Sequence, residues 1–222
     1  MQKIAVLLVD DHTVVRQGLR ALLAVEPDME IVGEADNGRL AVQSARELKP
    51  DVVIMDVAMP QLNGMEATWQ IARAHPRVRV LVLSSYRDIE MVDQIVEAGA
   101  AGYLPKQTAA GELLDAIRTV HAGNNYFNPT IAKRLREHRA AASARRAAEG
   151  KRADGLTPRE AEVLQLIAEG LANKQMAAEL RISIKTVEKH RQQVMNKLGI
   201  HDVAGLTRHA LAKGIIEPRT AL

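Results

Sequence analysis

The sequence has no cysteine among its 222 residues and few aromatic residues, namely one tryptophan, one phenylalanine and three tyrosines. The absence of cysteine excludes a disulfide framework and a thiolate metal site, and it suits a reducing compartment. No apolar stretch approaches the ~18 residues of a transmembrane helix, and the N-terminal residues lack the small-residue cleavage pattern of a signal peptide. We therefore expect a soluble, cytoplasmic protein without membrane contact.

Charge is unevenly distributed along the chain. Residues 1–125 carry 12 Lys and Arg against 17 Asp and Glu, a net charge of −5, whereas residues 126–222 carry 18 against 10, a net charge of +8. A basic second half is expected of a domain that binds a polyanion such as nucleic acid, although chance solvated charges would give the same count. The length suits two small domains, each with its own core.

The first 125 residues alternate between short β-branched runs and stretches with helical spacing. Strands are expected at 3–9, 30–35, 52–56, 78–84 and 102–104. Helices are expected at 13–24, 38–48, 64–74, 89–98 and 112–122. This pattern predicts an α/β fold, a flavodoxin-like (βα)5 domain whose doubly wound parallel sheet has the strand order 2-1-3-4-5.

The run 51–60 contains the central strand of this sheet. Val52, Val53 and Ile54 are apolar at consecutive positions, as in a strand buried on both faces, and the strand ends on Asp56. In a parallel α/β sheet the ligand crevice lies beyond the carboxyl ends of the strands. Asp56 is therefore a candidate for chemistry, although a strand-end aspartate can also simply cap the following loop.

Polar side chains follow the other strands at the same edge of the sheet. The first strand ends in Asp10 and Asp11, the fourth ends in Ser84, and Lys106 follows the fifth. Together with Asp56, the two acids would repel one another without a cation, and oxygen ligands favour Mg²⁺. Lys106 and Ser84 could hold a phosphoryl group on Asp56. The pattern predicts a carboxylate nucleophile that forms an acyl phosphate.

Four stretches resemble the receiver domain of two-component response regulators, namely Val9-Asp10-Asp11, Met55 to Pro60, Leu83-Ser84 and Gly99 to Lys106. The resemblance covers residues 1 to about 122. It implies that Asp56 accepts a phosphoryl group from a sensor histidine kinase, and that Mg²⁺ is held by Asp10, Asp11, Asp56 and the backbone carbonyl of Ala58. It also implies switch roles for Ser84, Tyr103 and Lys106.

Residues 126–154 separate the two halves of the chain. The segment 129–139 can be helical, but the alanine- and arginine-rich segment 140–154 has no sustained apolar stripe. Such a segment is a linker, either coil or a semi-rigid helical spacer. We therefore expect a receiver domain at 1–125, a partly helical linker at 126–154 and a second domain at 155–222.

The second domain has the pattern of an all-α, four-helix unit with a helix-turn-helix. Thr157 and Glu160 occupy the positions of a capping box before a helix that ends at Gly170. Three further helices are expected at 173–180, 184–198 and 202–213. A short helix, a brief turn and a longer helix form the order found in helix-turn-helix proteins that bind DNA.

The helix 184–198 has one apolar face, with Val187, Val194 and Leu198, and one polar face. On the polar face, Lys189 could donate to guanine, Gln192 could contact adenine at two points, and Glu188 could accept from cytosine. The other candidates for contacts with bases or phosphates are Lys174, Lys185, Thr186, His190, Asn196 and Lys197.

The stretch Leu156 to Glu160, with Val163-Leu164, Ala168 to Gly170, Lys174, Thr186-Val187, His190 and Lys197 to Gly199, resembles the LuxR-type helix-turn-helix of NarL/FixJ-like regulators. This resemblance covers about 156–216. It implies a regulator of transcription that binds double-stranded DNA, with a dimer contact through the fourth helix. Combined with the receiver, it implies control by phosphorylation of Asp56.

Two alternatives compete with this hypothesis. A phosphatase of the haloacid dehalogenase type also uses an aspartyl nucleophile and Mg²⁺, but it needs a second aspartate two residues later, where this chain has Ala58. A DNA-binding regulator with a degenerate receiver would work without phosphorylation, but every receiver position named above is filled. The single histidines, His12 among them, lack metal-ligand spacing and are not expected to bind a metal.

Overall fold

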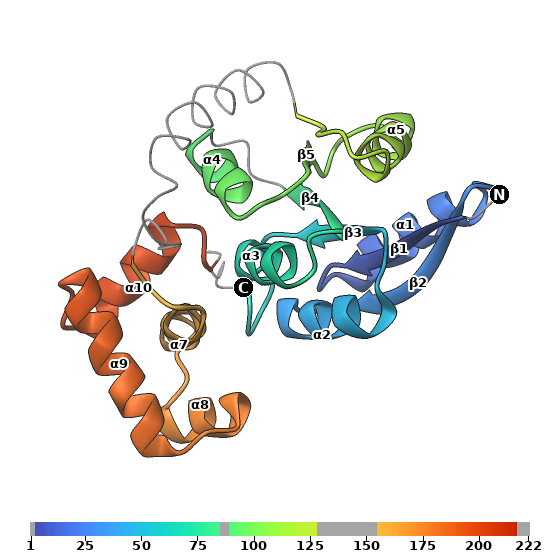
Figure 1. Cartoon of the computed structure of the whole chain (residues 1–222). Coiled ribbons are helices and arrows are strands. Elements are labelled where there is room, and N and C mark those ends of the chain that lie inside the picture. Colours follow the sequence, from blue (N-terminus) through green and yellow to red (C-terminus); the bar gives the residue numbers. More distant parts are fainter. Residues whose placement is uncertain (1–2, 85–88, 128–154, 217–222) are drawn as a thin grey trace. The chain divides into compact units, whose positions relative to one another are not determined.

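The structure is a computed structural model that describes residues 3–84, 89–127 and 155–216. The chain divides into two compact units, residues 1–145 and 146–222 (Figure 1). Apart from residues 126 and 127, the predicted linker and its predicted helix at 129–139 lie outside the described residues. No helix in the described ranges is long and apolar enough to cross a lipid bilayer.

The described part of the first unit contains a parallel sheet of five strands in the order β2-β1-β3-β4-β5, which confirms the predicted order. The strands are β1 (Ile4–Val9), β2 (Met29–Ala35), β3 (Val52–Asp56), β4 (Arg79–Ser84) and β5 (Gly102–Pro105). Each begins and ends within one residue of its predicted limits. All five residues of β3 are buried, as expected for the central strand.

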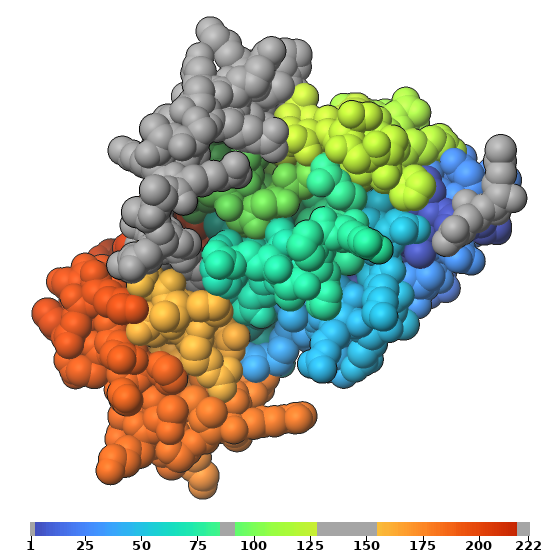
Figure 2. Space-filling model, viewed as in Figure 1, coloured from blue at the N-terminus to red at the C-terminus, as the bar shows by residue number. Residues whose placement is uncertain are grey.

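Helices cover both faces of this sheet (Figure 1). They are α1 (Thr13–Ala24), α2 (Gly38–Leu48), α3 (Gly64–Ala74), α4 (Ile89–Glu97) and α5 (Ala110–His121). Asparagine side chains cap two of them, because Asn37 accepts from the Leu40 N–H and Asn63 accepts from the Glu66 N–H, both at 2.9 Å. The capped helices α2 and α3 lie side by side on one face (Figure 2).

The core of the first unit has two layers, one on each face of the sheet. Val53 and Met55 of β3 pack in the layer that contains Ile71 of α3. Val52 and Ile54 pack in the other layer, with Ile117 of α5 among its members. Successive side chains of a strand point to opposite faces, so β3 supplies both layers and holds Asp56 rigidly at its end.

The second unit is helical throughout its described part. Its helices are α7 (Pro158–Ala168), α8 (Asn173–Leu180), α9 (Ile184–Leu198) and α10 (Val203–Ala212). Thr157 and Glu160 form the predicted capping box of α7, Ser183 caps α9, and Gly199 ends α9 with φ of 65°. These findings confirm the predicted helices and the predicted capping box.

Some apolar side chains lie outside the cores that their helical spacing predicts. In α10, Leu206 and Ala210 are buried, but Val203 and Leu211 are 47% and 36% exposed. In α1, Leu23 is buried, whereas Val14, in the first turn beside the end of β1, is 80% exposed. Helical spacing therefore finds the centre of each buried stripe but not its limits.

Candidate functional site

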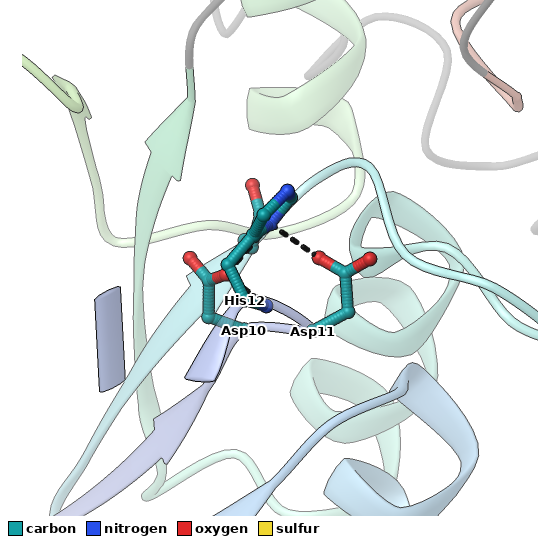
Figure 3. A group of neighbouring side chains, drawn as sticks. Asp10, Asp11 and His12 are labelled. Atoms are coloured by element: carbon teal, nitrogen blue, oxygen red, sulfur yellow. Dashed lines mark hydrogen bonds and ion pairs between the residues drawn. The ribbon is translucent and has the colours of Figure 1, made fainter. Parts of the chain in front are cut away.

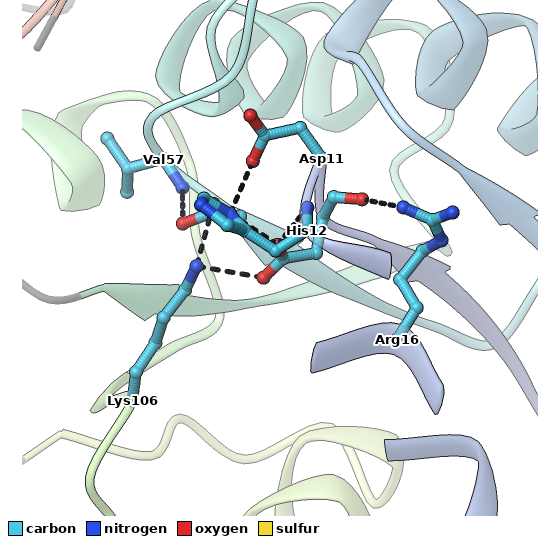
Figure 4. A network of polar contacts seen from close by, with 7 residues as sticks. Asp11, His12, Arg16, Val57 and Lys106 are labelled. Atoms are coloured by element: carbon cyan, nitrogen blue, oxygen red, sulfur yellow. Dashed lines mark hydrogen bonds and ion pairs between the residues drawn. The ribbon is translucent and has the colours of Figure 1, made fainter. Parts of the chain in front are cut away.

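Three of the predicted site residues meet at the carboxyl ends of β1, β3 and β5. Asp10 and Asp56 are buried, with 1% and 4% of their surfaces exposed. The Lys106 ammonium lies 2.8 Å from an oxygen of Asp10 and 2.8 Å from an oxygen of Asp56 (Figure 4). One lysine therefore bridges the acids that end two neighbouring strands.

The environment of Asp56 disfavours its negative charge. Burial raises the pKa of Asp56 to about 6, with a further contribution from the charge of Asp10, against the opposing hydrogen bond from Lys106. The other Asp56 oxygen accepts a 2.8 Å hydrogen bond from the Val57 N–H. Burial alone would lower the pKa of Lys106, but its bonds to the two carboxylates raise that pKa above its ordinary value. The site thus holds more negative charge than Lys106 neutralises.

Asp11 and His12 complete the cluster next to β1. The His12 ring Nδ1 lies 2.8 Å from an Asp11 oxygen and 3.2 Å from an Asp10 oxygen (Figure 3). The ligand atoms of Asp10, Asp11, His12 and Asp56 all lie within 4.8 Å of one another. His12, which the sequence did not single out as a metal ligand, therefore lies within the same cluster, where its ring pairs with the two acids.

This group of side chains fits a hard divalent cation. Three carboxylates lie together beside one lysine, and burial, with the charge of Asp10, raises the pKa of Asp56. Carboxylate oxygens are the ligands that Mg²⁺ prefers. Ala58, predicted to supply a backbone carbonyl, is partly buried in the loop between β3 and α3.

The loop after Asp56 returns very close to the strand. The Gly64 N–H donates to the Val57 carbonyl at 2.8 Å, and a Cβ atom at position 64 would lie 1.7 Å from the Asp56 carbonyl oxygen. Only glycine fits this approach of one backbone to another. The start of α3 thus holds the segment that follows Asp56.

Ser84 and Tyr103, the other two predicted residues of this pocket, are buried in β4 and β5. The Ser84 carbonyl accepts a 2.9 Å hydrogen bond from the Lys106 N–H. The Tyr103 N–H donates to the Tyr126 carbonyl at 3.0 Å, so the segment after α5 is bonded to β5. A hollow of about 420 Å³ beside β5 is lined by Tyr103, Leu104, Pro105, Thr108, Glu112, Tyr126 and Phe127.

In the second unit, α9 has the predicted division into two faces. Val187 and Val194 are fully buried. The side chains predicted to face DNA are exposed at Lys185, Glu188, Lys189, Gln192 and Asn196 of α9 and at Lys174 of α8. Gln192 donates to the side-chain oxygen of Asn196 at 3.0 Å.

Thr186 and His190 are less accessible than the other predicted contacts, since both are partly buried. The Thr186 hydroxyl lies 2.8 Å from that of Ser183, the residue that caps α9. The His190 Nδ1 atom is buried, and no described group forms a hydrogen bond with it. These two side chains lie at the edge of the exposed face rather than at its centre.

Lys197 has a partner inside its own domain. Its ammonium lies 2.6 Å from Glu160 and donates to the Gly155 carbonyl at 3.1 Å. Glu160 is only 2% exposed and also accepts from the Thr157 N–H at 2.7 Å. Burial would raise the pKa of Glu160, but these hydrogen bonds outweigh it and hold that pKa below its ordinary value. No helical spacing could indicate this pair, because 37 residues separate its members.

Comparisons with known proteins assign both units. The model of the response regulator receiver domain matches residues 6–118, and that of the bacterial regulatory proteins of the luxR family matches residues 154–210. The transcriptional regulatory protein LiaR of Bacillus subtilis is 42% identical over 202 residues, which cover 90% of this chain and 92% of LiaR. The response regulator protein VraR of Staphylococcus aureus is 36% identical over 214 residues, 96% of this chain and 99% of VraR.

Solved structures agree with these matches. The RcsB response regulator of Salmonella typhimurium is similar with a TM-score of 0.58 and 26% identity, over 96% of this chain and 99% of RcsB. Another similar structure, with a TM-score of 0.56, 26% identity and the same coverage, contains two RcsB dimers bound to two parallel DNAs. The chain therefore belongs to the response regulators that join a receiver domain to a LuxR-type domain, a family of DNA-binding transcription regulators and not of enzymes.

Proposed function

We propose that this regulator binds DNA in response to phosphorylation of Asp56 by a sensor histidine kinase. The observation that carries the proposal is the Lys106 ammonium, 2.8 Å from both Asp10 and Asp56 at the end of the buried central strand. The ammonium of Lys106 can bind the oxygens of a phosphoryl group on Asp56, and Asp56 itself belongs to the cluster that could hold a metal ion. We place the protein in the cytoplasm as a homodimer in its active state.

The phosphoryl transfer follows from these neighbours. An Asp56 carboxylate oxygen attacks the phosphorus of the donor, a new P–O bond forms, and the bond between phosphorus and the leaving imidazole breaks. Asp10, Asp11, Asp56 and the Ala58 carbonyl would hold Mg²⁺, which supplies positive charge to the phosphoryl oxygens. Lys106 exchanges its bond with the Asp56 carboxylate for one with the phosphoryl group.

The conformational response is assigned to Lys106, Ser84 and Tyr103. A phosphoryl group brings about −1.5 to −2 charges, so the Lys106 ammonium and the Ser84 hydroxyl move to meet it. The Lys106 N–H is bonded to Ser84, and the Tyr103 N–H to Tyr126, so a shift of β5 reaches the chain that leaves the receiver. We expect ~1–3 kcal/mol of coupling to dimerisation and DNA binding.

Since Tyr126 and Phe127 pack on the receiver cores, we extend the receiver by two residues beyond the predicted limit.

The exposed face of α9 is the proposed reader of the major groove. Lys189, Gln192 and Glu188 are placed at base edges, with Asn196 beside them. Lys174, Lys185, Thr186 and His190 are assigned to the DNA backbone. We expect Lys197 to contribute little to the binding of DNA phosphates, because its ammonium already pairs with Glu160. The RcsB dimers seen on DNA support binding of DNA as a dimer.

Phosphate uptake tests the acceptor assignment directly. We expect the wild-type protein to incorporate phosphate from acetyl phosphate in the presence of Mg²⁺, and chelation of the metal to stop the reaction. Asp56→Asn should incorporate none. Asp36→Asn is the matched control, because Asp36 also follows a strand of the sheet but is not part of the acidic cluster. Labelling of Asp56→Asn at the wild-type rate would refute the assignment.

The coupling between domains needs a second measurement. Mobility shifts on genomic fragments, with and without acetyl phosphate, should show tighter DNA binding after phosphorylation, and sedimentation should show a heavier species. Equal binding and equal sedimentation in both states would favour the alternative, a DNA-binding regulator that works without phosphorylation.

A further inference from the structure

Arg16 of α1 contacts the backbone of the acidic cluster rather than its carboxylates. Its Nη1 atom donates to the main-chain carbonyl of Asp10 at 2.6 Å (Figure 4). Its Nε atom donates to Glu34 of β2 at 3.3 Å. The Arg16 side chain is only 16% exposed. A single guanidinium thus joins α1, the end of β1 and the neighbouring strand β2.

The carbonyl that Arg16 binds belongs to the peptide between Asp10 and Asp11. The Asp10 N–H, on the other side of the residue, donates to the Ala35 carbonyl of β2 at 3.2 Å. Arg16 therefore completes the fixation of the backbone at Asp10. Rotation of this peptide would displace Asp10, Asp11 and the following His12, three of the four residues in the metal-binding cluster.

We propose that Arg16 is a positioning residue, which raises the affinity of the cluster for its divalent cation by fixing the Asp10–Asp11 peptide. This inference rests on the proposed function of the cluster. It goes beyond that function because Arg16 contacts neither the acceptor carboxylate nor a candidate ligand atom in the structure. Groups that hold metal ligands in place typically contribute 10–100-fold to metal affinity.

Electrostatics alone predicts the opposite effect. Arg16 carries a positive charge near the cluster, and removal of a cation near a cation site should tighten metal binding. Loss of positioning should weaken it. The sign of the change therefore separates the two explanations. Arg16→Lys adds a second test, because lysine keeps the charge but lacks the planar fork that reaches two acceptors in different directions.

The experiment measures the Mn²⁺ dissociation constant of the full chain by electron paramagnetic resonance of free Mn²⁺. We expect Arg16→Gln and Arg16→Lys each to weaken binding at least about 10-fold. Arg20→Gln is the matched control, because Arg20 also pairs with Glu34 from α1 but is 59% exposed. This control should stay within about twofold of wild type.

A second measurement excludes a general loss of structure. The Mg²⁺ concentration for half-maximal phosphate uptake should rise in both Arg16 variants, while the rate at saturating Mg²⁺ stays within about twofold of wild type. Unchanged or tighter Mn²⁺ binding by either Arg16 variant would overturn the inference, and so would equal weakening by Arg20→Gln. If wild type itself binds no Mn²⁺, the proposed function of the cluster fails instead.

Discussion

Each unit of the molecule contains a lysine that pairs with a buried carboxylate, and the two pairs differ in the balance of charge. Lys106 lies 2.8 Å from Asp10 and from Asp56, with Asp11 also in the cluster. Lys197 lies 2.6 Å from one acid, Glu160. The pKa of Asp56 is raised to about 6, whereas that of Glu160 is lowered.

This difference separates the proposed reactive site from a structural contact. Glu160 receives hydrogen bonds from Lys197 and from the Thr157 N–H, so its charge is satisfied within the folded domain. Asp56 is buried and shares Lys106 with Asp10, so its negative charge is poorly stabilised and the approach of a cation or a proton is favoured. The lysine–carboxylate distances do not distinguish the two pairs. Burial outweighs the hydrogen bonds at Asp56, whose lysine is shared with Asp10, and is outweighed by them at Glu160.

The largest expected effect concerns the stability of the receiver as a function of pH. Because the folded-state pKa of Asp56 exceeds the ordinary value of 3.8, the folded state binds more protons between about pH 4 and pH 6, and stability falls as the pH rises through this window. Asp56→Asn removes this cost, so it should stabilise the metal-free protein at pH 8 by up to about 3 kcal/mol and much less near pH 4.

Urea unfolding monitored by fluorescence of Trp69, the single tryptophan of the chain, measures this change within the receiver. Asp36→Asn should shift the unfolding midpoint little at either pH. If Asp56→Asn instead lowers the stability at pH 8, the Lys106 bonds outweigh the burial of Asp56, and the contrast between the two lysine pairs is lost.

The next effect concerns the second pair. Lys197→Ala leaves the buried Glu160 without its cation, and we expect a loss of about 1–3 kcal/mol in the stability of the helix-turn-helix domain. Since the pKa of Glu160 is lowered, its contribution is present above its ordinary pKa and disappears as the pH falls through the lowered value. Calorimetry at neutral and acidic pH measures both. Lys189→Ala, on the exposed face of the same helix, should cost less than ~0.5 kcal/mol.

The remaining effects concern DNA binding. Gln192→Ala should cost roughly 1–3 kcal/mol of binding free energy at one base position and relax the base preference there.

Lys174→Ala should weaken binding to all sequences and lower the slope of affinity against salt concentration by about 1. Lys197→Ala should change that slope less than Lys174→Ala, because its ammonium is held by Glu160. A larger salt effect for Lys197 would show that this lysine leaves Glu160 to bind DNA.

The elements of both domains could be predicted because their signals are local. The run of β-branched residues lies within β3 itself. The caps lie directly before the helices that they begin, at Thr157, Ser183 and Asn63. The edge at which the acids meet also follows from the sequence, since all strands are parallel and their carboxyl ends share one side.

The contacts that sequence patterns could not give are those between distant side chains or with the backbone. Glu160 was identifiable as part of a capping box and Lys197 as a candidate DNA contact, but their pairing depends on how α7 packs against α9. Arg16 has an ordinary place on α1, and nothing in its spacing indicates that it binds a carbonyl of Asp10. The contacts of the His12 ring with Asp10 and Asp11 depend on the turn that follows β1, although the three residues are adjacent in the chain.

The close approach at Gly64 has a consequence for the range of sequences that this fold accepts. The residue has no functional group, yet any side chain there would overlap the carbonyl oxygen of the proposed acceptor residue. A mutational scan would therefore classify position 64 with the essential chemical positions, although it takes no part in any chemical step. In this receiver, intolerance to substitution marks backbone crowding around the acceptor as well as the groups that react.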